Sequence, residues 1–87
     1  MGLDTVEVVI NIEKKYKIEI SDEDAASIAT IGEIAAYIVV TTKLQNNDEY
    51  EFDDVVDYLK NMIHKDFDVP LEKIEINSHV VFDLGLD

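Results

Sequence analysis

The most regular stretch of the chain covers residues 52–66 and reads FDDVVDYLKNMIHKD. Its apolar residues recur at three- and four-residue steps, which is the spacing of one face of an α-helix. Carboxylates gather at its beginning, where they stabilise the positive end of the helix dipole. The pattern therefore predicts a long amphipathic helix, and such a helix needs other elements to cover its apolar face.

Three further helices are predicted before this one. Residues 3–17 carry apolar side chains at helical spacing, while 22–28 and 31–40 follow the capping residues Ser21 and Thr30, each with an acid three positions further on. Val8 to Ile10 resembles a strand locally, but the helical spacing on either side continues through it, so the helix is favoured. The sequence therefore predicts an all-α protein, a small antiparallel four-helix bundle with two long helices and two short ones. The residues expected to line its core are Val6, Ile10, Ile34, Ile38, Val56, Leu59, Ile63 and Phe67.

The remaining segments are predicted to be loops. Asp68 and Pro70 interrupt the chain after the long helix, and the apolar residues beyond them favour a long loop with buried anchors. The stretch 41–51 is polar and acidic but contains neither Gly nor Pro. If it were helical, residues 31–66 would form one helix and each half of the bundle would pair with another chain, giving a domain-swapped dimer. The residues Asn46 to Asp48 favour a turn instead, and hence a monomer.

The composition of the 87 residues limits the partners and the compartment. Twenty acidic residues against seven lysines give a net charge of −13, which repels nucleic acids and anionic membrane surfaces and favours a basic protein partner. No apolar run is long enough to cross a membrane, and the acidic beginning lacks the basic part of a signal peptide. We therefore expect a cytoplasmic or organelle-matrix protein. Because the chain has no cysteine, disulfides and thiol nucleophiles are excluded.

The sequence gives little support for catalysis or metal binding. His64 and His79 are the two imidazoles, and each stands alone, so they assemble neither a catalytic triad nor a His-rich metal site. The acid-rich stretches lack the alternation and the glycine of a calcium-binding loop, and the three glycines form no phosphate-binding loop. We therefore expect neither an enzyme nor a metal site.

Two parts of the chain carry a familiar pattern in an unfamiliar order. A set of residues resembles the second half of an acyl carrier protein of fatty acid synthesis: Leu3 to Glu7 (LDTVE), Glu13, Ile18 to Ala25 (IEISDEDA), and Ile28 to Ile31 with Tyr37 and Ile38. Val56 to Val69 is similar to the first helix of that family, and Phe82 to Asp87 to the acidic loop before its modification site. The resemblance implies a circularly permuted order within a single domain, 1–87: residues 1–40 as the family's second half, 41–51 as a joining linker and 52–87 as its first half.

The resemblance also locates the position of the family's prosthetic group. There a serine hydroxyl carries 4'-phosphopantetheine through a phosphodiester, and acyl chains travel as thioesters on that arm. In the family's order one residue, the serine, stands between the positions that match Asp87 and Leu3, yet in this chain Leu3 is preceded by Gly2 and no serine stands there. The resemblance thus implies an acyl carrier scaffold that holds no cofactor and cannot be acylated.

Carrier proteins of this family meet their partners through the helix that follows the attachment point. By resemblance, Asp4, Glu7 and Glu13 are expected to contact basic patches of fatty acid synthase enzymes and of phosphopantetheinyl transferase. Charge alone favours a solvated helix face for the same residues. A second hypothesis is an acidic helical protein-interaction module that never carried a prosthetic group.

Overall fold

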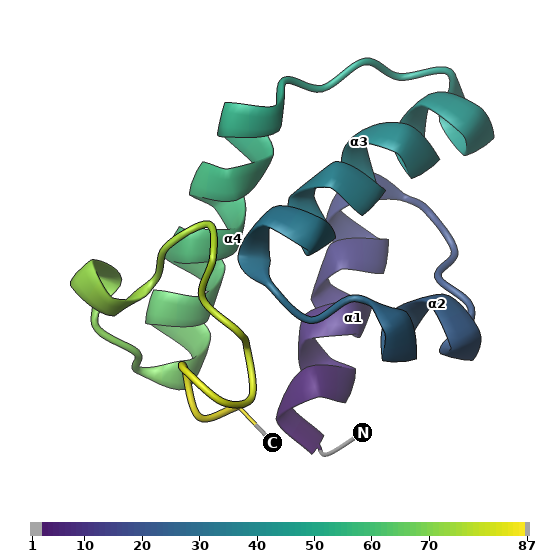
Figure 1. The fold of residues 1–87 in the computed structure, drawn as a ribbon. Helices are drawn as coiled ribbons and strands as arrows, with labels where there is room; N and C mark the ends of the chain where they lie inside the picture. The colour runs from purple at the N-terminus through teal and green to yellow at the C-terminus, as the bar shows by residue number, and fades with distance from the viewer. Residues whose placement is uncertain (1–2, 87) are drawn as a thin grey trace.

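Four α-helices make up the computed structural model, which describes residues 3–86 (Figure 1). Residues 3–86 form no strand, and one isolated antiparallel bridge joins Thr30 and His79. The predicted all-helical bundle is confirmed. The elements are α1 (Leu3–Tyr16), α2 (Asp22–Ser27), α3 (Ile31–Asn46), α4 (Phe52–Phe67) and the 3-10 turn η1 (Leu71–Lys73), after which a long loop leads to the C-terminal end.

The helices α1 and α4 run in opposite directions and contact each other (Figure 1). The side-chain amide of Asn11 donates to Oδ2 of Asp66 (3.2 Å), and the hydroxyl of Tyr58 donates to the carbonyl oxygen of Asn11 (3.4 Å). The helix α3 packs against α4 after the chain has reversed direction between them. Each long helix therefore has a neighbour that covers its apolar face.

The capping residues predicted from the sequence begin two of the helices. The Ser21 hydroxyl accepts the N–H of Asp24 (3.2 Å) at the start of α2. At the start of α3 the Thr30 hydroxyl accepts the N–H of Glu33 (3.2 Å), and Oε1 of Glu33 accepts the N–H of Thr30 (2.9 Å). These bonds to Thr30 hold the pKa of Glu33 below its usual range because they favour the ionised carboxylate.

The core is built from one face of each long helix, but α1 turns a different face inward than predicted. Five predicted core residues are buried (Ile34, Ile38, Val56, Leu59 and Ile63), and Phe67 packs half-buried against them. On α1, Val6 and Ile10 are 36% and 41% exposed, so their assignment to the core was wrong. The buried side chains of this helix are Val8, Ile12 and Tyr16. Since α1 carries apolar residues on more than one face, spacing alone could not decide which face is buried.

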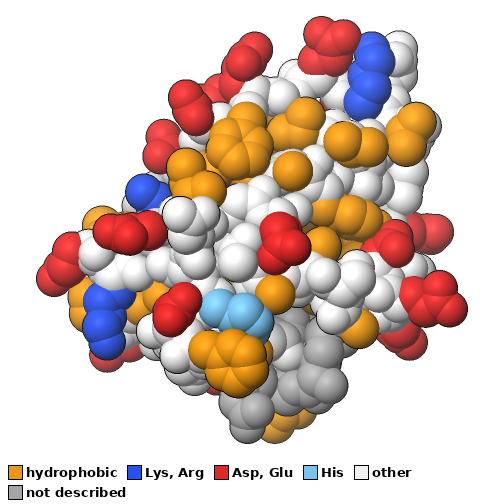
Figure 2. All heavy atoms as spheres, in the orientation of Figure 1, with side chains coloured by type: hydrophobic (Ala, Val, Ile, Leu, Met, Phe, Trp, Pro, Cys, Tyr) orange, Lys and Arg blue, Asp and Glu red, His pale blue; other side chains and the backbone are white. Residues whose placement is uncertain are grey.

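Acidic side chains dominate the outline of the molecule, and apolar side chains gather on one face (Figure 2). A band of apolar atoms crosses the upper part of this view, over α3 and the beginning of α4. Two side chains of α3 are well exposed, Val40 at 58% and Leu44 at 79%. The bundle therefore does not bury all the apolar surface that its helices carry.

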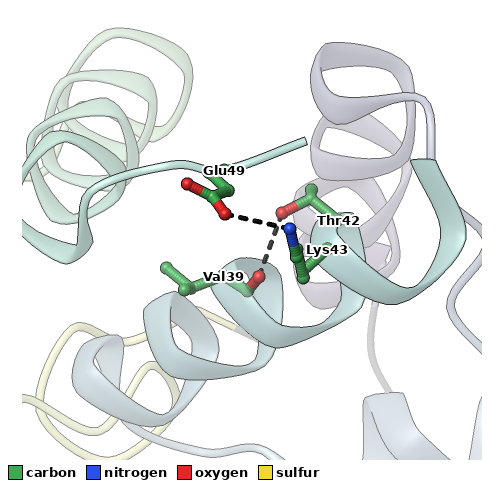
Figure 3. A network of polar contacts seen from close by, with 4 residues as sticks. All are labelled: Val39, Thr42, Lys43 and Glu49. Carbon is green, nitrogen blue, oxygen red and sulfur yellow. Dashed lines mark hydrogen bonds and ion pairs between the residues drawn. The ribbon is translucent and has the colours of Figure 1, made fainter. Parts of the chain in front are cut away.

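The helix α3 is longer than predicted, because it continues to Asn46 and not to residue 40. The bundle thus has three long helices and one short one, where the sequence predicted two of each. The hydroxyl of Thr42 donates to the carbonyl oxygen of Ile38 (2.8 Å) and to that of Val39 (3.1 Å), the second of which Figure 3 shows. A polar residue is thus buried inside the helix without a loss of hydrogen bonds. After residue 40 the apolar residues no longer recur at regular helical steps. The sequence therefore predicted an end of this helix that lies too early.

The break between α3 and α4 lies where the asparagines predicted a turn. Asn47 adopts the left-handed conformation (φ 57°) that ends many helices, and its N–H donates to the carbonyl oxygen of Lys43 (3.1 Å). The ammonium group of Lys43 then reaches Oε1 of Glu49 (2.9 Å) across the connection (Figure 3). Both side chains are largely exposed, so this ion pair adds little stability. Residues 31–66 are therefore not one continuous helix.

Three tyrosines join the end of α1 to the connection and to α4. The ring of Tyr16 packs edge-on against the rings of Tyr50 and Tyr58, with centroids 5.0 and 5.5 Å apart. Burial raises the pKa of Tyr16 to about 12, and the two neighbouring phenols and Asp54 act in the same direction. The phenol of Tyr16 is thus kept un-ionised by its position in the fold.

The raised pKa of Tyr16 predicts a loss of stability at alkaline pH. Such a phenol contributes stability that is complete below the unfolded pKa of 10.0 and disappears as the pH rises through about 12. Tyr16→Phe cannot ionise, so its free energy of unfolding should fall less over this pH range than that of the unchanged chain. Urea denaturation at several alkaline pH values measures the difference, and parallel losses in the two proteins would contradict the prediction.

Candidate functional site

The C-terminal loop, residues 74–86, is held at the beginning of α3 by backbone hydrogen bonds. The N–H groups of Ile31 and Gly32 donate to the carbonyl oxygens of Ser78 (3.1 Å) and Ile76 (2.8 Å). In return the N–H of Val80 donates to the carbonyl oxygen of Ala29 (2.9 Å). The first N–H groups of a helix have no hydrogen-bond acceptor within the helix. The carbonyl oxygens of the loop supply acceptors for two such groups of α3.

Side chains within the loop fix its shape. The Ser78 hydroxyl accepts the N–H of Glu75 (2.9 Å) and donates to the carbonyl oxygen of Lys73 (3.0 Å). Nδ1 of His79 accepts the N–H groups of Val81 and Phe82 (3.1 Å each), which places the proton of the neutral ring on Nε2. The predicted loop with buried anchors is confirmed, and its buried residues are Ile74, Ser78, Val80, Leu84 and Leu86.

A cavity of about 590 Å³ lies between this loop, α1 and α2. Its volume falls in the range of small-molecule pockets, about 300 to 1,000 Å³. Most of its lining is apolar, with Thr5 and His79 as polar members. Such a cavity can accept a hydrocarbon chain. The apolar lining includes Val8, Val9 and Ile12 of α1, Ala25 and Ile28 in and after α2, and Val80 of the loop.

The two described ends of the chain lie at the same end of the bundle. Figure 1 shows the beginning of α1 and the last turn of the C-terminal loop there. Thr5 and Val81 line the same cavity from these two segments. Leu3, one of the three residues predicted to flank the attachment position, is 83% exposed. The other two, Gly2 and Asp87, lie outside the described residues.

The three acids predicted to meet a partner occupy different environments on α1. Glu7 is exposed, Asp4 is half-buried in the first turn, and Glu13 is half-buried near the other end. Oε2 of Glu13 accepts the N–H of Ile20 (2.9 Å), so this carboxylate has a structural task in the connection to α2. Glu7 is therefore the acid with the most accessible side chain of the three.

Several of the described hydroxyl groups have a place in the fold. By resemblance, a 4'-phosphopantetheine arm would be attached at the residue before Leu3, and Thr5, which carries a hydroxyl, lies half-buried two positions beyond Leu3. The hydroxyls of Ser21 and Thr30 cap helices, and that of Thr42 is bonded within α3. None of the helices in residues 3–86 is long and apolar enough to span a bilayer. Within the same residues, no three His, Asp or Glu side chains come together as a metal site would require.

The cavity itself was not predicted from the sequence. His79 was assessed as an isolated histidine, and Val8, Val9 and Ile12 only as part of a helical pattern. The one signal was the excess of apolar residues on α1, which exceeds what a single buried face requires. The docked loop brings these residues together, and nothing in the local pattern of residues 74–86 specifies where the loop docks.

A small acidic bundle of helices with an apolar cavity is the class of protein that this geometry defines. Comparison with known proteins narrows the class. The chain is similar to the acyl carrier protein of Wolinella succinogenes, with 53% identity over 37 residues. These residues make up 42% of this chain and 49% of that relative, so the chain spans about half the length of the curated relative it matches. No protein-family model matches the chain, and no solved structure matches it. The chain is thus related to acyl carrier proteins over part of its length.

Gly32 allows the close approach of the loop to α3, and this contact can be tested. A methyl group on Gly32 would lie 2.7 Å from Cγ2 of Ile76 and 3.2 Å from its carbonyl oxygen. Gly32→Ala should therefore displace the loop and lower the free energy of unfolding by about 1 to 3 kcal/mol, the usual cost of overpacking, although alanine favours helices.

Hydrogen exchange of the Val80 N–H, which bonds to Ala29, reports the displacement. Exchange should accelerate in Gly32→Ala, and the double variant Gly32→Ala/Ile76→Ala, which lacks the crowded methyl group, should recover part of the protection. Unchanged exchange at Val80 in the single variant would show that the loop tolerates the methyl group.

Proposed function

We propose that this chain is an acyl carrier scaffold in circularly permuted order, without catalytic activity and without the residue that holds the prosthetic group. The extent of the match is the observation that carries the proposal. The 37 matched residues make up 42% of this chain and 49% of the Wolinella succinogenes protein. The two proteins are therefore similar in length, although the match covers only about half of each. A permutation has this effect, because a collinear comparison can follow only one of the two exchanged halves.

The arrangement of the chain ends supports the permuted order. Circular permutation is tolerated where the original ends lie close together and the new break falls in an exposed segment. The beginning of α1 and the C-terminal loop share the lining of one cavity, as the two sides of a former loop would. We place the junction of the former ends in the connection between α3 and α4. It was expected at residues 41–51, and residues 47–51 are its part outside the helices.

The proposed role of the scaffold is to dock on enzymes of fatty acid synthesis through α1. Exposed apolar side chains, Leu3, Val6 and Ile10, lie on this helix beside the exposed carboxylate of Glu7. Apolar contact at the centre and acids at the rim fit an enzyme surface that carries lysine or arginine around an apolar patch. The proposed compartment is that of such enzymes, the cytoplasm or an organelle matrix.

The second hypothesis, an acidic interaction module that never carried a prosthetic group, predicts the same charge and a similar bundle. It gives no reason for a 53% identity to a carrier protein that stops near half of each chain. The two hypotheses differ in what happens when the carrier order is restored.

Restoring the carrier order should restore modification. A reordered chain that begins at Asp48, runs to Asp87, continues through one serine into Leu3 and ends at Asn47 contains the family's Asp-Ser-Leu sequence. With coenzyme A and a phosphopantetheinyl transferase, its mass should rise by one 4'-phosphopantetheine group, while the chain in its present order should keep its mass.

A reordered chain with glycine at the junction is the matched control, because it differs from the serine form by one residue at the attachment position. A folded serine form that the transferase leaves unmodified would argue for the interaction module. A mass increase of the chain in its present order would contradict the loss of the attachment site.

If the chain docks through α1, a charge reversal on α1 should weaken binding to the enzyme more than the same reversal elsewhere on the surface. Glu7→Lys should weaken binding to a carrier-dependent synthase, by about 3- to 10-fold for the loss and reversal of one rim charge. Glu23→Lys makes the same change in net charge on the exposed surface of α2 and is the matched control. Isothermal titration calorimetry at low and high salt measures both variants. Equal weakening by the two substitutions would mean that only net charge attracts the enzyme.

A further inference from the structure

The exposed face of α3 carries an apolar stripe that the bundle leaves uncovered. Val40 and Leu44 are 58% and 79% exposed, and Ala36 is exposed one turn before Val40. Ile76 of the docked loop extends the stripe at its other end, where it is 46% exposed beside Gly32. The band of apolar side chains across the upper part of Figure 2 runs over this helix. Exposed apolar stripes of this kind mark interaction sites.

The charge of α3 distinguishes it from the other helices. Its sixteen residues include one acid, Glu33, and one base, Lys43, so the helix is neutral in a chain with a net charge of −13. The helix α4 carries four aspartates against two lysines, and α2 has three acids in succession and no base. Two copies of so acidic a chain repel each other wherever such surfaces meet. The face of α3 is where a second copy can approach closely.

The spacing of the stripe fits an antiparallel pair of α3 helices related by a two-fold axis at the level of Ile38, whose own side chain is buried in the core. Glu33 and Lys43 lie five residues before and after Ile38, so the axis brings Glu33 of one chain to the level of Lys43 of the other. Ala36 and Val40 lie two residues on either side, which sets a small side chain against a larger one. Two-fold interfaces place the same patch on both chains, and each contact occurs twice.

The polar contacts of the single chain are compatible with this pairing. Both hydrogen bonds that Glu33 accepts, from Ala29 and Thr30, use Oε1. The pair of Lys43 with Glu49 is solvent-exposed, with side-chain exposures of 52% and 80%, so Lys43 can exchange that partner at little cost. Ala36 is exposed and has a small side chain, which permits the close interaxial distance of packed helices at this level.

We propose that this chain forms a homodimer through α3, with the two helices antiparallel and Glu33 of one chain facing Lys43 of the other. The dimer joins two intact bundles and exchanges no helix between them. It departs from the expectation of a monomer, which rested on the turn at Asn47, since that turn excludes only the swapped form. The proposal does not depend on the acyl carrier function, because it uses neither α1 nor the cavity.

Sedimentation equilibrium of the full chain over a wide concentration range tests the dimer. The unchanged chain should show a monomer–dimer equilibrium, and Val40→Glu should raise the dissociation constant at least about tenfold, because two carboxylates would be desolvated without partners. Leu71→Glu, at a side chain 42% exposed on η1, is the matched control and should leave the equilibrium unchanged. Circular dichroism verifies that both variants fold.

The proposed pairing of Glu33 with Lys43 of the other chain can be tested separately. Lys43→Glu should weaken the dimer by about threefold or more, because it replaces two cross-chain attractions by repulsions. Lys60→Glu on α4 makes the same change in net charge and should have less effect. A chain that remains monomeric at millimolar concentration would overturn the proposal. A dimer that Val40→Glu leaves intact would overturn it as well, since it would use another surface.

Discussion

The contact between the C-terminal loop and the first turn of α3 determines most of what is distinctive in this bundle. Backbone groups of Ile76, Ser78 and Val80 pair with those of residues 29–32, so the loop is fixed by main-chain hydrogen bonds and not by side chains alone. The loop then forms one wall of the cavity and brings the far end of the chain to the beginning of α1. Without it, the N–H groups of Ile31 and Gly32 would lose their partners, and the cavity would lose the wall that His79, Val80 and Val81 form.

Local rules of helix formation explain why the fold could be predicted so largely from the sequence. The caps at Ser21 and Thr30 and the break after Phe67 depend on residues within one turn of each boundary, and all three were placed within one or two residues. The end of α3 was predicted too early, because Thr42 stands where an apolar residue would continue the helical pattern. Its hydroxyl donates to the carbonyl oxygen of Ile38 within the helix. In a sequence pattern a threonine counts as polar, although in a helix it can be buried in the core when its hydroxyl bonds to the backbone of the preceding turn.

The site was harder to predict because it depends on which face of α1 is buried. Apolar residues at Leu3, Val6 and Ile10 and at Val8, Val9 and Ile12 describe two faces of the same helix. The second face lies against α2 and the docked loop, with which it lines one cavity, and this is a tertiary constraint that the spacing of α1 does not contain. The same ambiguity carries a functional consequence. The face left outside is the one that we propose for docking, and the face turned inward lines the cavity.

The two surfaces proposed for binding, the exposed faces of α1 and of α3, differ in their charge. The exposed face of α1 sets apolar side chains beside Glu7, so it favours a partner that supplies positive charge. The face of α3 offers one acid and one base placed symmetrically about Ile38, which suits a copy of itself. In a protein with a net charge of −13, self-association and attraction of a basic enzyme would compete if both used one acidic surface. Because they lie on different helices, dimer formation leaves α1 of each chain available for an enzyme, and the two α1 surfaces of a dimer could engage a paired target with higher avidity than one.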